Sequence, residues 1–204
     1  TQCLIIAPEV GTGNVFKLVE YTGGTSNLSI TSTFNDGDTT NYVDRFPRFA
    51  VLAVSGSVYT VASTGLTRSG AYPYARVWDI DTSAGSATSR GILYPQGVVG
   101  AGAAQTELVE LGTVGGKECF AIFYGKSTAG YGVLYYAVYE YNTSTNTLVE
   151  VVGDTLYQSG SNQCVTDFQY KIEDGIGLIS YIENNAAAYV AGCTYDGTTF
   201  TVGT

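Results

Sequence analysis

The chain has 204 residues, of which 45% are hydrophobic and only 13% are charged, and its formal net charge is −9. This composition excludes disorder driven by charge repulsion, and the scattering of the 9 basic residues argues against nucleic acid or an anionic membrane as a partner. No apolar stretch approaches the roughly 20 residues of a membrane-spanning helix, and the absence of histidine removes the commonest general base and metal ligand.

The first elements along the chain read as an antiparallel meander. Short β-branched or aromatic runs, separated by turn-forming residues, occupy 3–10, 15–23 and 28–33. No window of a dozen residues shows the apolar spacing of a helix. The pattern predicts an all-β chain that begins with three strands. Methionine is absent, even at position 1, so we expect a processed chain or a piece of a longer one.

An aromatic-rich strand that runs into a polar residue and a tight turn recurs after 15–23, at 74–82, 135–143 and 189–197. Aligning Tyr21, Ile80, Tyr141 and Tyr195 gives offsets of 59, 61 and 54 residues. The strand before it lies at 3–10, 57–63, 119–125 and 176–183, the strand after it at 28–33, 87–93, 147–152 and 199–202, and a further strand at 48–54, 107–112 and 165–171. We therefore expect a four-stranded antiparallel unit repeated three times after a first copy that lacks one strand, fifteen strands in all.

In repeat length and strand order, nearly the whole chain resembles a β-propeller. We predict a single all-β domain over 1–204, a four-bladed propeller with blades at about 1–44, 45–99, 100–160 and 161–204. A β-sandwich or jelly roll is the main alternative, and a β-solenoid or irregular β fold is the next. The motifs of WD40 and kelch blades are missing. The size is similar to that of hemopexin-like domains, which link their first and last blades by a disulfide.

The four cysteines show no C-x-x-C spacing, which favours two disulfides in an oxidising compartment over a zinc site, with four buried thiols as the alternative. Cys3 and Cys119 begin equivalent strands of opposite blades, so they should not pair. Two pairings remain, and we favour Cys119 with Cys164 and Cys3 with Cys193.

Two further groups of residues are candidate sites. Sequons, or a rarer variant of one, make Asn27, Asn142 and Asn162 candidates for N-glycosylation. The acidic loop 35–44 could place Asp36, Asp38 and Asp44 around a hard cation. Because the loop lacks the EF-hand pattern, a solvated turn is the better interpretation, and we expect neither a metal nor another cofactor.

Aromatic residues are unusually frequent, with 17 Tyr, 8 Phe and one Trp. Period-two alternation places Tyr135, Tyr139 and Tyr141 on one face of a strand. Together with Trp78 they are weak candidates for a binding surface that would take a glycan or a protein neighbour. Packing between neighbouring blades is the alternative.

These features favour a structural or assembly module without enzymatic activity: an extracellular appendage, fibre, virion or cell-surface component that contacts protein neighbours. It would self-assemble or contact flanking domains, and the edge of the incomplete blade could accept a strand from another copy or from flanking sequence. The alternative function is that of a lectin-like propeller. A glycosidase that uses two carboxylates is a third possibility, although no pair of acids is singled out among the 18.

Overall fold

A computed structural model describes residues 2–9, 13–21, 28–35, 43–67, 72–95, 106–127, 132–158, 164–171, 175–183 and 187–203. The regular elements in these ranges are β-strands. No helix among the described residues is long and apolar enough to cross a membrane.

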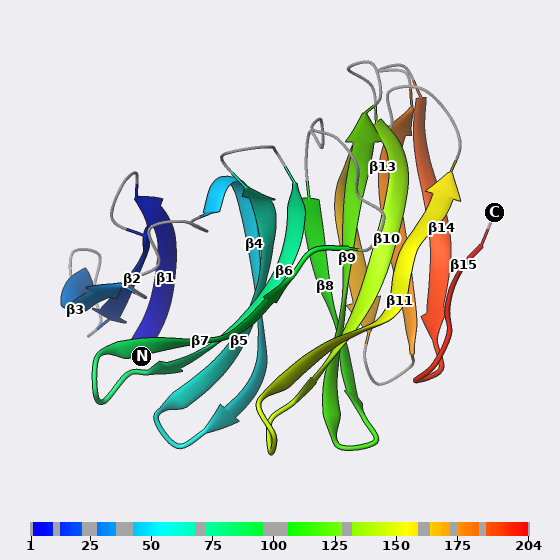
Figure 1. Cartoon of the computed structure of the whole chain (residues 1–204). Coiled ribbons are helices and arrows are strands. Elements are labelled where there is room, and N and C mark those ends of the chain that lie inside the picture. Colours follow the sequence, from blue (N-terminus) through cyan, green and yellow to red (C-terminus); the bar gives the residue numbers. More distant parts are fainter. Residues whose placement is uncertain are drawn as a thin grey trace.

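The described strands form four antiparallel sheets, each built from strands that are consecutive in the chain (Figure 1). Sheet 1 contains β1 (Gln2–Glu9), β2 (Gly13–Tyr21) and β3 (Leu28–Asn35). Sheet 2 contains β4 (Val43–Ser55), β5 (Val58–Thr67), β6 (Pro73–Asp81) and β7 (Ser86–Leu93). Sheet 3 contains β8 (Thr106–Val114), β9 (Lys117–Ser127), β10 (Gly132–Asn142) and β11 (Thr147–Gln158). Sheet 4 contains β12 (Cys164–Lys171), β13 (Ile176–Glu183), β14 (Ala187–Tyr195) and β15 (Phe200–Val202).

This grouping confirms the predicted all-β class and the series of three strands followed by three sets of four. Four separate sheets differ from the two-sheet sandwich that was the main alternative. Sheets 1 and 4 lie at opposite ends of the series (Figure 1). The described residues therefore show successive sheets and no closed ring.

A repeated β-bulge confirms the repeat alignment. Between the last two strands of a sheet, the pairing shifts by one residue at Leu18/Val19, at Val77/Trp78 and at Val138/Tyr139. In each case, the two residues between which the pairing shifts lie three and two positions before the aligned residue, which is Tyr21, Ile80 or Tyr141. A bulge adds one residue to one strand and increases the local twist, so sheets 1, 2 and 3 are the same structural unit.

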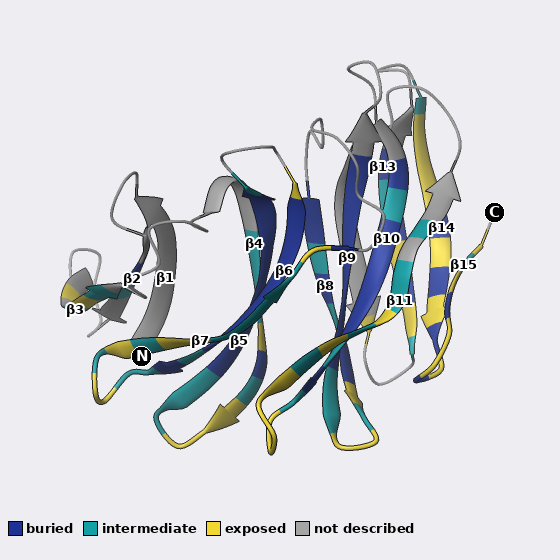
Figure 2. Ribbon diagram, in the orientation of Figure 1, coloured by how far each residue is buried: buried dark blue, intermediate teal, exposed yellow. Residues whose placement is uncertain are grey.

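Three hydrophobic cores lie between successive sheets, and each takes residues from both neighbours (Figure 2). The core between sheets 1 and 2 contains Phe16, Val61, Tyr74, Trp78 and Ile80. The core between sheets 2 and 3 contains Leu52, Ala62, Ala75, Val77, Phe120, Ile122, Tyr124, Ala137, Tyr139 and Tyr141. The core between sheets 3 and 4 includes Leu111, Cys119, Phe123, Tyr136, Ile179, Tyr181, Cys193, Tyr195 and Phe200.

The middle sheets are buried on both faces. In β6, Tyr74 and Trp78 pack toward sheet 1, whereas the alternate residues Ala75 and Val77 pack toward sheet 3. Every residue of β9 from 119 to 125 is buried. A strand buried on both faces reads as a continuous apolar run, which is why β9 has the sequence Cys-Phe-Ala-Ile-Phe-Tyr-Gly at these positions.

A bidentate ion pair joins the first strands of sheets 2 and 3. Arg48 of β4 donates from Nε and Nη2 to the two carboxylate oxygens of Glu107 on β8, both at 2.8 Å. The hydrogen bond to Glu107 is the main reason why the pKa of Arg48 is raised. Two parallel hydrogen bonds fix the orientation of both groups, so this pair orients one sheet against the next.

The stacked cores predict a large cost for truncating Phe120, which is fully buried and stacks on Tyr139 with ring centroids 5.5 Å apart. We expect Phe120→Ala to lower the free energy of unfolding by about 3–5 kcal/mol. Urea denaturation followed by the fluorescence of Trp78 would measure it. Val54→Ala is the control, because Val54 is 58% exposed and should change stability by less than about 0.5 kcal/mol. Equal effects of the two changes would contradict the assignment of this core.

Candidate functional site

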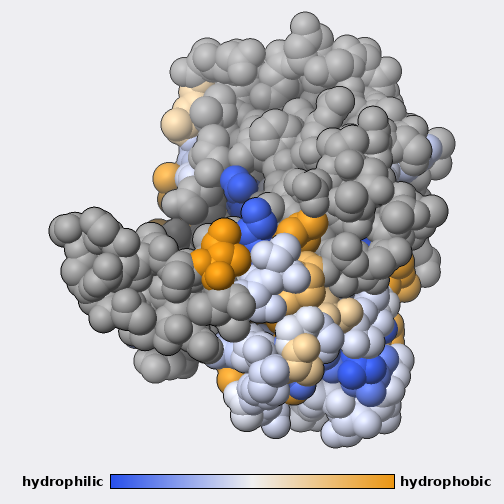
Figure 3. All heavy atoms as spheres, turned by 90° about the vertical axis from the view of Figure 1, so that its left-hand side faces the viewer, coloured by the Kyte–Doolittle hydropathy of each residue, from blue (hydrophilic) through white to orange (hydrophobic). Residues whose placement is uncertain are grey.

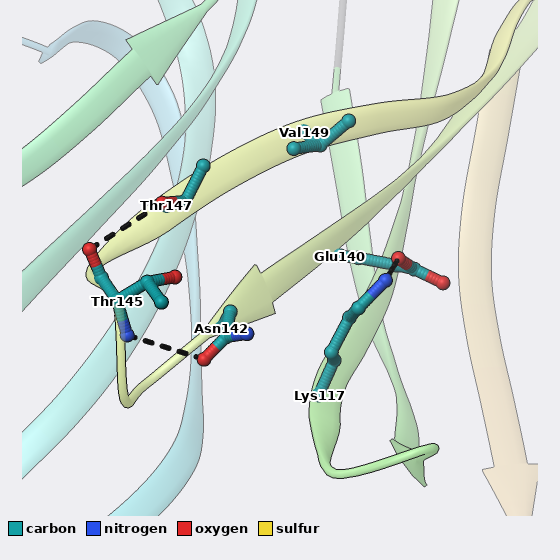
Figure 4. Close-up of a pocket in the computed structure, with 6 residues that line it drawn as sticks. All are labelled: Lys117, Glu140, Asn142, Thr145, Thr147 and Val149. Carbon is teal, nitrogen blue, oxygen red and sulfur yellow. Dashed lines mark hydrogen bonds and ion pairs between the residues drawn. The ribbon is translucent and has the colours of Figure 1, made fainter.

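A surface hollow of about 180 Å³ lies on sheet 3, beside the hairpin that joins β10 to β11 (Figure 4). It is lined by Lys117, Glu140, Asn142, Thr145, Thr147 and Val149. Glu140 and Asn142 lie on one face of β10 because they are two residues apart, and their partners on β11 are Val149 and Thr147. The hollow is therefore a product of strand register and of the turn at its edge.

The turn holds its shape through side-chain hydrogen bonds. Asn142 accepts with Oδ1 from the backbone N–H groups of Ser144 and Thr145, at 2.9 and 3.2 Å. Asn146 has a positive φ of 55°, a conformation that asparagine tolerates better than most residues. Its Oδ1 also accepts from the Tyr141 hydroxyl at 3.0 Å. These contacts place Thr145 and Thr147 at the rim.

The charged groups of the hollow neutralise each other. The Lys117 Nζ of β9 forms an ion pair with the Glu140 carboxylate of β10, and the hydrogen bond to Glu140 is the first cause of the raised pKa of Lys117. The hollow thus offers an ion pair, hydroxyl groups and an amide, which can form hydrogen bonds with a polar ligand. Its one carboxylate is already paired, so the lining does not supply the two carboxylates of a glycosidase.

The same turn chemistry occurs in sheets 2 and 4. Asp81 and Asp196, which align with Asn142, accept from backbone N–H groups two and three residues later in the chain. Hydrogen bonds, with that of the Ser83 hydroxyl the largest, lower the pKa of Asp81 to about 2, and backbone donors beginning with Thr199 lower the pKa of Asp196. These side chains are structural acceptors.

The aromatic residues predicted as a binding surface lie mostly in the cores. Trp78, Tyr139 and Tyr141 are fully buried, and Tyr135 is half-buried against the core between sheets 2 and 3. The predicted common face of Tyr135, Tyr139 and Tyr141 is confirmed, but it packs against sheet 2. A buried ring cannot act as an exposed platform, so the alternative, packing between neighbouring sheets, is what the structure shows.

Neither favoured disulfide is formed. Cys119 and Cys193 are free, buried thiols in the core between sheets 3 and 4, whereas the side chains of Cys3 and Cys164 lie outside the described residues. Burial raises the pKa of Cys119, and it raises that of Cys193 to about 11. Because the thiolate is the reactive form, both cysteines behave as apolar core residues here.

The remaining predicted sites lie mainly outside the described part of the chain. This applies to the glycosylation candidates Asn27 and Asn162, to the metal candidates Asp36 and Asp38, and to the side chain of Asp44. Among the described residues, no group of three or more acidic or cysteine side chains is placed to hold a metal ion. Asn142 is half-buried at the start of its exposed turn.

Sequence reasoning did not single out the pairing of Lys117 with Glu140. Both residues were visible, and Glu140 directly precedes the recurring aromatic position Tyr141. What was lacking was the register of β9 against β10, in which Tyr141 lies opposite Glu118 and Glu140 opposite Cys119. This register brings Lys117, the first residue of β9, within reach of the Glu140 carboxylate.

The chain matches no protein-family model, and no curated protein matches it either.

The low pKa of Asp81 predicts a pH-dependent contribution to stability. A carboxyl group whose pKa is lower in the folded state stabilises the fold above its ordinary value of 3.8, and this contribution is lost as the pH falls toward about 2. Asp81→Asn keeps an acceptor oxygen, as Asn142 does, but removes the charge. We expect wild type to have a higher Tm than this variant at pH 7, and the difference to shrink toward zero near pH 2. A difference that does not vary with pH would contradict this.

The geometry of Asn142 allows its sequon to be tested without damaging the turn. After secretion from a host that glycosylates asparagine, we expect Asn142→Asp to remove the mass of one glycan. Its Tm should stay near that of the unglycosylated wild type, because Asp81 and Asp196 form the same turn. Asn146→Asp, outside any sequon, is the matched control. Equal intact masses for wild type and Asn142→Asp would show that the sequon is not used.

Proposed function

We propose that this chain is a non-enzymatic structural module of the β-propeller class that assembles with protein neighbours at the outside of a cell or virion. The main support for this proposal is the outer face of sheet 4. There Leu178 and Val190 are 55% and 69% exposed, beside exposed Ile176. Contiguous apolar side chains on a surface are typical of a protein contact.

The contacts of the first strands support a radial arrangement. β4 contacts β8, and β8 contacts β12, as expected of innermost strands that converge on an axis. Arg48 and Glu107 join two of them. A single-chain ring would also need sheet 4 against sheet 1, whereas these sheets lie at opposite ends (Figure 1). The proposed propeller is therefore an open series of blades that a neighbour continues.

A carbohydrate-binding function has less support. Sugar sites commonly use an exposed aromatic ring. The aromatic residues that the sequence analysis proposed for binding lie in the cores or against them. The hollow beside Asn142 is lined by polar residues and Val149, without an aromatic side chain. The support for an extracellular location is the low charge and the exposed sequon turn. The free thiols of Cys119 and Cys193 do not support it.

Two measurements test the assembly function. We expect the sedimentation coefficient of the wild-type chain to rise between about 1 µM and about 100 µM, a range in which moderate interfaces dissociate. We also expect binding to a glycan array to stay at background. A monomer over the whole range would contradict self-assembly. A monomer that binds glycans reproducibly would favour the lectin alternative.

A further inference from the structure

We infer that the outer face of sheet 4 binds the free face of sheet 1 in a second copy of this chain, so that copies associate head to tail. This inference rests on the proposed assembly function and names its partner. The surface concerned consists of the outward residues of β13 and β14, here called the sheet 4 face: Ile176, Leu178, Ser180, Ala188, Val190, Gly192 and Thr194.

Register and burial define the sheet 4 face. Leu178 lies opposite Gly192, and Ser180 lies opposite Val190. The alternate residues Ile179 and Ala191 are buried against sheet 3. Every position of the face in β14 is exposed, and none of the seven residues of the sheet 4 face is charged. Lys171 is an exposed charge at the edge, opposite Ile176.

The repeat shows what normally covers such positions. With Tyr195, Tyr141 and Ile80 aligned, Val190 corresponds to Tyr136 and Ala75. The strand pairing extends this alignment to the preceding strand of each sheet, where Leu178 corresponds to Ala121 and Ala62. The four corresponding residues in sheets 2 and 3 are buried, and each packs in the core against the following sheet. The sheet 4 face is the same surface without its following sheet among the described residues.

The matching surface is the side of sheet 1 that faces away from sheet 2, here called the sheet 1 face, and its described side chains include Lys17, Ile30 and Thr33. Phe34 packs toward sheet 2, but the bulge pairs Ile30 with Val19 and turns it to the opposite side. Ile30 is 58% exposed. Figure 3 views the molecule from this end, where the hydrophobic residues that are described form separate patches among polar ones.

In sheets 3 and 4, the residues equivalent to Ile30 contact the preceding sheet. Ile30 corresponds to Glu150 in sheet 3 and to Val202 in sheet 4. Val202 packs against the core that sheet 4 shares with sheet 3. Glu150 accepts from the hydroxyl of Tyr139, a member of the core shared with sheet 2. In sheet 1 no preceding sheet lies among the described residues, and we assign its place to a second copy.

A second copy is favoured over the same chain by geometry. Sheets 2 and 3 lie between sheet 1 and sheet 4 (Figure 1). Two copies placed in line would bring a sheet 4 face against a sheet 1 face and continue the series of three similar contacts. Such a contact uses two different surfaces, and it therefore produces closed rings or open filaments.

Charge substitutions with complementation test the inference. We expect Val190→Asp and Ile30→Asp each to weaken self-association at least about tenfold in sedimentation, because each would bury an unpaired carboxylate. Val54→Asp is the matched control, since Val54 is 58% exposed on sheet 2, and it should associate like wild type. An equimolar mixture of Val190→Asp and Ile30→Asp should form a one-to-one dimer, because each variant keeps the face that the other has lost.

The outcomes separate the inference from the function on which it rests. A monomeric wild type contradicts the assembly function itself. If wild type associates but the mixture stays monomeric, or Val190→Asp associates normally, assembly uses another surface and the inference is wrong. Monomers whose Tm falls in both variants, but not in Val54→Asp, would indicate that the two faces meet within one chain. Leu178→Asp repeats the test should Val190→Asp fail to fold.

Discussion

The packing of sheet on sheet through both faces is the constraint on which the rest of this structure depends. A sheet covered on one side needs apolar residues at every second position, whereas a sheet covered on both sides needs them at nearly every position. β9 and β6 meet the second demand, and β14 meets the first. The place of each sheet in the series is therefore visible in its pattern of burial.

Two charged side chains of sheet 2, Arg76 and Asp79, lie beside partners. The Arg76 side chain is buried on the face of sheet 2 that meets sheet 1, and its guanidinium lies 4.8 Å from the ring centre of Trp78. Its Nε donates to the Ser89 hydroxyl at 3.2 Å. On the opposite face, Asp79 accepts from Arg90 and Thr60. Buried charges need such partners, and here they also fix the register of neighbouring strands.

Much of the local structure could be predicted from the sequence, because strand runs, turns and the recurring aromatic position depend on neighbours along the chain. The alignment of Tyr21, Ile80 and Tyr141 even located a common bulge. Tertiary relations could not be predicted this way. The pattern of a single strand does not encode how the sheets stack. It therefore could not show whether Tyr139 faced solvent or another sheet, or whether Cys119 met another cysteine. The ion pair of Lys117 with Glu140 likewise required a register between two strands.

The volumes that meet at each interface explain why the repeat is weak in sequence although it is regular in structure. Sheet 2 presents the small residues Ala62 and Ala75 to sheet 3, which answers with large rings such as Tyr139. At two equivalent positions of the next interface the sizes are exchanged: Tyr136 of sheet 3 stands where sheet 2 has Ala75, and Cys193 of sheet 4 stands where sheet 3 has Tyr139. Sheet 4 also contributes the large rings of Tyr195 and Phe200 to this core. Close packing requires only that the summed volume fills the space between two sheets. Equivalent positions can then diverge in pairs, so a structural repeat persists without a shared motif.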